Sequence, residues 1–183
     1  MSYIRQLKEY FYKRQIEKAE QHKVARRSRS LEQSKHIGLL FDGNDNNTVD
    51  AILAYAEKLR KKGKEVTLLG FLNTKEPVAD NPFPYFNKKQ IRFNLVPKGA
   101  DVEKFIQQKF DLLINFFPKD NLPLEYITTS SKAHCRIGNQ SQKLHCFDLI
   151  IRTPKKEKDF AFFTRQIEQI LSKMNRKTYE SAV

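Results

Sequence analysis

The segment His36–Leu72, HIGLLFDGNDNNTVDAILAYAEKLRKKGKEVTLLGFL, shows first a strand-like and then a helical periodicity. A compact β-type run over His36–Asp42 precedes Thr48–Lys62, in which apolar residues return at three- and four-residue spacing. The helical pattern ends at Gly63, and a glycine directly after the last periodic residue predicts the C-terminus of a helix. The apolar run Glu65–Leu72 then predicts a second strand. Together these patterns predict a βαβ unit.

The alternation of strand and helix continues along the chain. We expect Asn47 or Thr48 to cap the first helix of the unit. After a proline-rich connection the periodicity predicts, in order, a strand at Ile91–Val96, a helix opened by Asp101, a strand at Asp111–Phe117, a short helix at Pro123–Ser131, strands at Ala133–Ile137 and Phe147–Ile151, and a closing helix at Asp159–Met174. Such alternation predicts an α/β fold: a three-layer Rossmann-like or flavodoxin-like domain with a mostly parallel sheet.

The N-terminal residues add a basic amphipathic helix to this domain. Apolar side chains within residues 3–22 recur at helical spacing, and Tyr3, Leu7 and Phe11 form a stripe that we expect to pack along the domain or on a partner. Residues 23–34 show no apolar period, which indicates a solvated linker or an arm that orders on binding. The expected organisation is a helix and arm over 1–34, one α/β domain over 35–177 and a disordered tail over 178–183.

Positive charge is concentrated at the two ends of the chain, whose formal net charge is +13 over 183 residues. Residues 1–35 hold ten Lys or Arg against four acids, and residues 152–177 hold eight against three. Because this distribution increases self-repulsion, it indicates a polyanionic partner. The candidate nucleic-acid-binding residues are Arg5, Lys8, Lys13, Arg14, Lys18, Lys23, Arg26, Arg27, Arg29, Lys35, Lys88, Lys89, Arg92, Lys155, Lys156, Lys173, Arg176 and Lys177.

The leading hypothesis is a non-catalytic RNA-binding protein of the cytoplasm, associated with ribosomes. A further alternative is a peripheral membrane adaptor whose helix 3–22 lies in the interface of an anionic bilayer. No apolar run approaches the roughly 18 residues of a membrane span, and two cysteines suit a reducing compartment. The oligomeric state stays open.

The loop Asp42–Asn47 follows the first strand, where open α/β sheets usually bind ligands. It lacks the Lys and Ser/Thr of a phosphate-binding loop, and Leu53 stands where a calcium loop places glutamate. We therefore favour turn and capping roles for Asp42 and Asp45 over catalysis or metal binding, and expect no cofactor.

Two further motifs have a structural and a functional interpretation. The aromatics of Asn81–Lys89 are expected to fold back onto the sheet, with RNA base stacking as the alternative. The dipeptides His134-Cys135 and His145-Cys146 raise the possibility of zinc, but neighbouring strand residues point to opposite faces. We expect buried, reduced and metal-free cysteines.

Three blocks carry a resemblance to a known family: FDLLINF at Phe110–Phe116, DNLPLEYI at Asp120–Ile127 and SSKAHCRIG at Ser130–Gly138. They resemble the most distinctive part of a bacterial domain family of unknown function. The similarity extends to LLGF at Leu68–Phe71 and to the basic N-terminal helix, so it covers nearly the whole chain. It implies a single domain in a bacterial cytoplasm and supplies no activity.

The same three blocks are similar to part of the N-terminal half of heptosyltransferase-type glycosyltransferases. In those enzymes an Asp after the first strand acts as base, which implies such a role for Asp42 or Asp45. The similarity thus implies a small transferase or nucleotide-sugar-binding enzyme. Because those enzymes need a second nucleotide-binding half, for which no residues are left here, we expect at most a shared half-fold.

Overall fold

The computed structural model describes residues 3–21, 24–27, 29–117, 121–139, 146–152 and 160–180, and the backbone alone for 174–180. The elements of these residues are, in order, α1 (Tyr3–Gln21), β1 (His36–Asp42), α2 (Asn46–Lys61), β2 (Glu65–Leu72), β3 (Tyr85–Asn87), the 3-10 turn η1 (Lys88–Gln90), α3 (Ala100–Gln107), β4 (Leu112–Phe116), α4 (Leu122–Ser130), β5 (Cys135–Asn139), β6 (Leu149–Ile151) and α5 (Phe160–Glu180).

The six strands form one parallel sheet in the order β3-β2-β1-β4-β5-β6. This 3-2-1-4-5-6 order is that of the Rossmann dinucleotide-binding folds and differs from the 2-1-3-4-5 order of flavodoxins. The predicted α/β class with a parallel sheet is therefore confirmed, and the strand order favours its Rossmann-like form. The order reverses between β1 and β4, so the carboxyl ends of these two strands flank the switch point.

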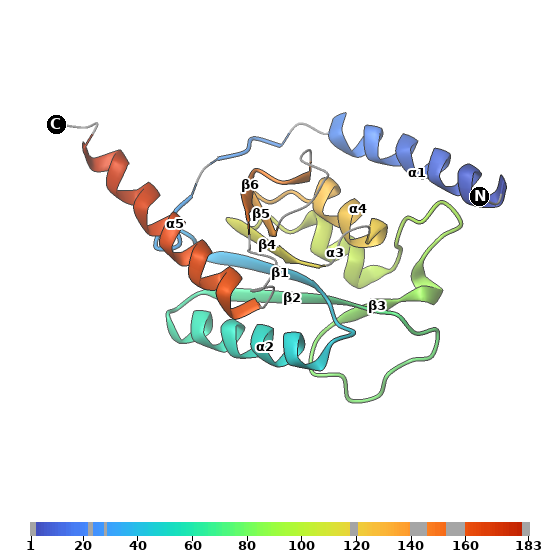
Figure 1. Cartoon of the computed structure of the whole chain (residues 1–183), viewed down its shortest axis with the longest axis horizontal. Helices are drawn as coiled ribbons and strands as arrows, with labels where there is room; N and C mark the ends of the chain where they lie inside the picture. The colour runs from blue at the N-terminus through green and yellow to red at the C-terminus, as the bar shows by residue number, and fades with distance from the viewer. Residues whose placement is uncertain are drawn as a thin grey trace.

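Helices cover both faces of the sheet, which gives three layers (Figure 1). α2 and α5 lie on one face and share a core with Ile37, Leu39 and Phe41 of β1. α3 and α4 lie on the other face, against Leu40 of β1 and Leu113 of β4. Both faces of the central strands are thus buried, which explains why their sequences are continuously apolar. α1 lies outside this sandwich, on α4.

The strand expected at Ile91–Val96 is wrong. That segment folds on itself: the amide of Arg92 donates to the carbonyl of Val96 at 2.9 Å, and Leu95 has a positive φ of 64°. Residue Ile91 makes an isolated antiparallel bridge to Pro97. The strand that joins the sheet is β3, within the connection expected as a loop, and it pairs with β2 from Gly70 to Leu72.

Two element ends also differ from expectation. α2 is capped by Asp45, whose side chain accepts from the amide of Thr48 at 3.1 Å, so the cap expected at Asn47 or Thr48 is wrong. The backbone of α5 continues to Glu180, into the segment expected as a disordered tail, and 181–183 lie outside the described residues. Phe83 and Phe86 of the proline-rich connection are buried against the sheet, as expected.

Candidate nucleic-acid interface

α1 is held on the domain by one face of the helix. Tyr12, Ile16 and Ala19 are buried, and the Tyr12 hydroxyl donates to the carbonyl of Leu122 in α4 at 2.8 Å. Burial, followed by the nearby charge of Glu125, raises the pKa of Tyr12 above its usual value, which keeps the hydroxyl protonated as a donor. The stripe of Tyr3, Leu7 and Phe11 does not pack along the domain, because Tyr3 and Phe11 lie exposed on another face; its docking on a partner stays a prediction.

The segment after α1 is bound to the start of β5. The amide of Arg27 donates to the carbonyl of His134 at 2.9 Å. The half-buried guanidinium of Arg26 donates to the carbonyls of Ser131 and Ala133. Burial and the charge of the nearby Arg136 lower the pKa of Arg26. Residues 24–27 therefore contact the domain through the Arg27 amide and the Arg26 side chain, while the side chains of Ala25 and Arg27 are exposed.

Asp111, just before β4, connects the arm to the start of β1. Its Oδ2 accepts from the amides of Lys35 and His36 at 2.8 and 3.0 Å, and its Oδ1 lies 3.6 Å from Nε of Arg29. Burial raises the pKa of Asp111, but the two amide hydrogen bonds and the Arg29 charge outweigh burial, so the pKa is lowered overall. Nδ1 of His134 lies 3.7 Å from the same Oδ1. The amino ends of β1, β4 and β5 thus meet at one carboxylate.

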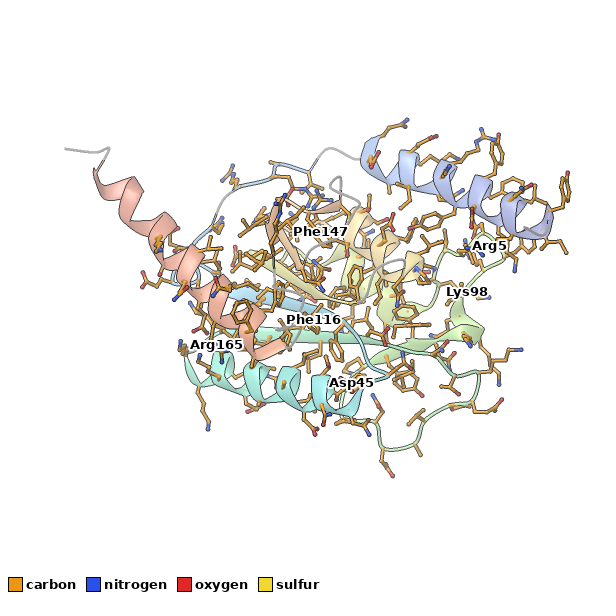
Figure 2. All side chains as sticks on the ribbon, in the orientation of Figure 1. Arg5, Asp45, Lys98, Phe116, Phe147 and Arg165 are labelled. Carbon is orange, nitrogen blue, oxygen red and sulfur yellow. The ribbon has the colours of Figure 1, made fainter. Side chains whose placement is uncertain are left out.

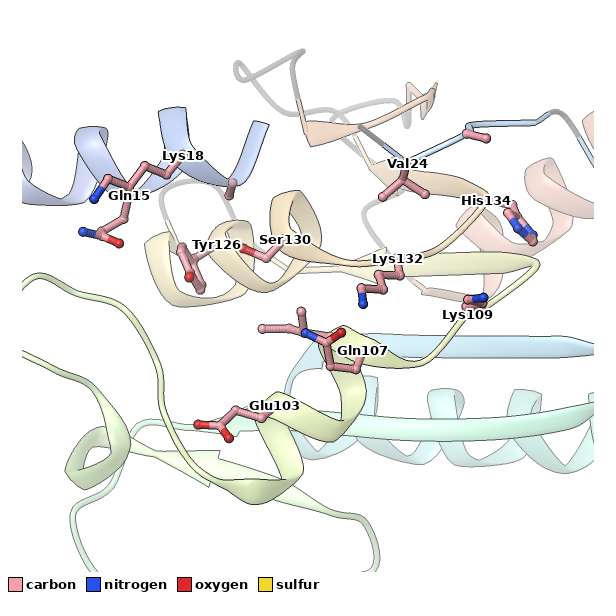
Figure 3. Close-up of a pocket in the computed structure, with 13 residues that line it drawn as sticks. Gln15, Lys18, Val24, Glu103, Gln107, Lys109, Tyr126, Ser130, Lys132 and His134 are labelled. Atoms are coloured by element: carbon pink, nitrogen blue, oxygen red, sulfur yellow. The ribbon is translucent and has the colours of Figure 1, made fainter. Parts of the chain in front are cut away.

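A groove of about 810 Å³ lies between α1, the arm, α3 and α4 (Figure 3). Its cationic lining comes from Lys18 on α1, Lys109 before β4 and Lys132 before β5, with His134 beside them. Glu103 is the one acidic side chain among the described lining residues. Figure 3 shows Lys132 directed from the end of α4 into the space above α3. We call this the basic groove.

The lysines of the basic groove have no ion-pair partner among the residues that the structure describes. Two enclosed polar atoms at its wall, Oγ of Ser130 and Nδ1 of His134, also make no hydrogen bond there. Tyr126 adds a partly exposed aromatic ring. The surface therefore combines unpaired lysines with an aromatic ring, which are the groups that hold phosphates and stack on bases.

Sequence reasoning missed Lys109, Lys132 and His134, although a signal was present. Each stands in the short connection between a helix and the next strand, and parallel neighbouring strands begin at the same edge of a sheet. The backbone fixes this proximity: the amide of His134 donates to the carbonyl of Phe110 at 2.8 Å, and that of Lys132 to Ile106 at 3.1 Å. The parallel arrangement of β4 and β5 therefore brings the basic residues just before these two strands close together.

The predicted site residues do not form one surface. Lys18 lines the basic groove, and Arg26 and Arg29 make the contacts within the chain given above. α1 and α5 lie on opposite faces of the sheet, so their cations are far apart (Figure 1). The other described candidates are Arg5, paired with Glu9; Lys35, paired with Glu65; Lys89, paired with Glu76; Lys8, over the Phe93 ring; and Lys13, Arg14, Arg27, Lys88, Arg92 and Lys173, which are exposed.

Several of the residues singled out from the sequence lie outside the part of the chain that the structure describes. These are Lys23, Lys155, Lys156 and His145, and the side chains of Arg176 and Lys177.

A second, smaller cavity of about 250 Å³ lies at the switch point, between the carboxyl ends of β1 and β4. Asp42, Asp45 and Phe116 line it. Asp42 accepts from the amide and side chain of Asn44 and from Nδ2 of Asn121 at 3.4 Å, while Asp45 caps α2. The carboxylates therefore serve the turn and the cap. A phosphate at this helix end would meet two negative charges instead of free amides.

Residues 8–174 match the sequence profile of DUF6913, a family of unknown function. The chain belongs to this family. No curated protein and no solved structure matches it. The expected membership of a family of unknown function is confirmed.

In this DUF6913 protein the buried polar residues of the distinctive block serve structure. Buried Asn115 donates to the carbonyl of Ile137 at 3.0 Å and accepts from Oγ1 of Thr128 at 2.8 Å. Arg136 forms a bidentate pair with Asp148, with distances of 3.1 and 2.9 Å. These groups join β4, α4, β5 and β6 and hold the sheet together, whereas Tyr126, Lys132 and His134 of the same block line the basic groove.

The cysteines of this DUF6913 protein are free and buried at Cys135 and Cys146. Burial, and after it the charge of Asp148, raises the pKa of Cys135 to about 11, which keeps the thiol protonated. Within the described residues no cluster of His, Cys, Asp and Glu could hold a metal ion. None of the described helices has the length and apolar content needed to cross a membrane.

Proposed function

We propose that this protein binds RNA without catalysis and that the basic groove holds the RNA backbone. The observation that carries the proposal is the convergence of Lys18, Lys109 and Lys132, from three separate segments, with no acidic partner among the described residues. A groove that collects unpaired positive charge costs self-repulsion in the free protein. Phosphate oxygens would relieve that cost and release bound counterions.

Tyr126 suggests how the RNA would lie. The ring offers a platform for a base, and bases of single-stranded RNA stack on such rings in a sequence-tolerant way. Exposed Arg27 on the arm adds positive charge beyond the groove. We therefore expect unpaired segments of structured RNA, with ribosomal RNA the foremost candidate, and a cytoplasmic protein.

The alternative of a small transferase that uses Asp42 or Asp45 has less support. The carboxylates of Asp42 and Asp45 accept hydrogen bonds from the turn and from the end of α2. The switch-point cavity, of about 250 Å³, is also smaller than typical ligand pockets of roughly 300–1,000 Å³. The heptosyltransferase similarity remains a prediction.

Charge reversal in the groove tests the proposal. The double variant Lys109→Glu/Lys132→Glu should weaken binding of a single-stranded RNA and lower its logarithmic salt slope by about 1.4, at about 0.7 per lost phosphate contact. The matched control is Lys61→Glu/Lys62→Glu, an exposed pair at the end of α2 on the other face of the sheet. Both variants reverse two charges near helix ends, so they control for net charge and for the helix dipole.

Fluorescence anisotropy at several salt concentrations measures both quantities. Equal losses in the two double variants, or an unchanged slope in the groove variant, would contradict the proposed interface. Ribosome association is tested separately by sedimentation of the native protein with ribosomal subunits. Absence from every ribosomal fraction would remove that partner.

A further inference from the structure

Exposed apolar side chains of this protein are gathered at one place. Among the described residues six large apolar side chains are exposed, and four of them lie in the first nine residues of α1. They are Tyr3, Ile4, Tyr10 and Phe11, with exposed fractions of 78%, 58%, 56% and 39%. A fifth, Phe93, adjoins α1 because Nζ of Lys8 lies 5.2 Å from its ring centroid. We call the four α1 residues, with partly buried Leu7, the α1 apolar face.

This face points away from the contact that holds α1 in place. At 100° per residue, Tyr3, Leu7 and Phe11 lie on the side of the helix opposite Tyr12 and Ile16, which pack on α4. Figure 1 shows the N-terminal end of α1 projecting beyond α4, and Figure 2 shows its side chains spread on the outside of the molecule. α1 therefore carries two apolar faces, of which the domain covers one.

Cations accompany the α1 apolar face. Arg14 and Lys18 continue the same side of the helix toward its C-terminal end, and both are exposed. Over its length α1 carries five Lys or Arg against three Glu. Aromatic and aliphatic side chains on one side, followed by cations, are the composition of helices that lie in the interface of an anionic bilayer. Tyr is also favoured at that depth because its ring is apolar and its hydroxyl is polar.

We infer that α1 docks the protein on an anionic phospholipid bilayer, with the α1 apolar face inserted among the lipids and the α1 cations on the headgroups. Charge complementarity selects this occupant: the chain carries +13, and anionic leaflets attract basic segments. A second copy would bring the same positive charge into contact. RNA fits this face less well, because the aliphatic side chains of Ile4 and Leu7 cannot stack on bases.

The apolar part of this docking surface lies outside the basic groove, and Lys18 is the α1 cation that the two surfaces share. The groove lies beneath α1, between its C-terminal half and α3, whereas the α1 apolar face lies outside and nearer the N-terminal end. Membrane binding and RNA binding can therefore be tested separately in the same protein.

A single tryptophan tests the insertion. The chain contains no Trp, so Phe11→Trp in the full-length protein places one reporter on the α1 apolar face. Val78→Trp is the matched control, because Val78 is the sixth exposed apolar residue, lies away from α1 and has an exposed fraction of 41% against 39% for Phe11. Vesicles of phosphatidylcholine with phosphatidylserine should shift the emission of Phe11→Trp to the blue, and vesicles of phosphatidylcholine alone should not. The emission of Val78→Trp should not change with either.

Vesicle sedimentation with a second pair of variants measures the affinity. Phe11→Asp should lower partition onto the anionic vesicles by at least about tenfold, whereas Val78→Asp, with the same change of charge, should stay within about twofold. Failure of the wild-type protein to sediment with anionic vesicles would overturn the inference. So would equal losses in the two Asp variants, a Phe11-dependent dimer in analytical ultracentrifugation, or loss of RNA affinity in Phe11→Asp as large as that of the groove variant.

Discussion

Replacement of Ile16 by alanine measures how strongly α1 is held on the domain. Ile16 keeps only 7% of its surface exposed and lies with Tyr12 and Ala19 against α4. The change removes three carbon atoms, which costs about 2.4 kcal/mol at about 0.8 kcal/mol per buried methylene, before any cavity left behind. For a chain of this length each kcal/mol shifts Tm by about 2–4 °C. The expected decrease in Tm is therefore about 5–10 °C.

Phe11→Ala is the control on the same helix, because Phe11 lies on the exposed side. It removes a larger side chain but should change Tm by less than about 2 °C, since little contact is lost. Calorimetry gives Tm, and hydrogen exchange of the α1 amides detects a helix that detaches before the domain unfolds. If the two variants agree in both measurements, or if Phe11→Ala has the larger effect, the docking of α1 through Ile16 is refuted.

Three further predictions concern the domain itself. Asp111→Ala leaves the two amides at the start of β1 without their acceptor and should lower the free energy of unfolding by about 2 kcal/mol at pH 7. Because the folded-state pKa of Asp111 is lowered, its contribution is complete above about pH 4 and is lost as pH falls through the folded value, so the gap between variant and wild type should close in acid denaturation series. Cys135 should react with a thiol reagent at pH 8 only on unfolding, because its pKa is about 11 and it is buried; rapid labelling of the native protein would contradict this. Gly138→Ala would place a methyl group against the Phe147 ring and should cost about 1–3 kcal/mol in a urea titration, and an unchanged midpoint would show that the ring moves aside freely.

The strongly apolar elements could be predicted from sequence because their periodicity follows directly from burial. β1, β2 and β4 are enclosed on both faces, so each appears as a continuous apolar run. β3 could not be found this way, because it is three residues long and follows Pro84 in a connection rich in turn residues. Ile91–Val96 has a strand-like composition, but the tight turn at Leu95 prevents it from extending.

The packing of α1 could not be decided from its own sequence. The helix has one apolar stripe with Tyr12 and Ile16 and another with Tyr3, Leu7 and Phe11. Periodicity shows both stripes, but only the shape of α4 and the carbonyl of Leu122 select the first as the contact. The second, more aromatic stripe is the one that stays exposed.

The separation of the two basic ends follows from how the sheet must be covered. Crossovers between parallel strands are right-handed, so reversing the strand order after β3 places α3 and α4 on the face opposite α2. α2 lies beside β1 and β2. On the same face of the sheet, Leu112 and Ile114 of β4 and Ile137 of β5 would be exposed to solvent if no other helix covered them. α5 supplies Phe163 and Ile167 to that region, while α1 finds its contact on α4, across the sheet. Charge at the ends of a sequence therefore does not imply charge on one surface. The burial of strand residues decides where each helix lies, and the residues that gather positive charge are those of the connections that begin β4 and β5.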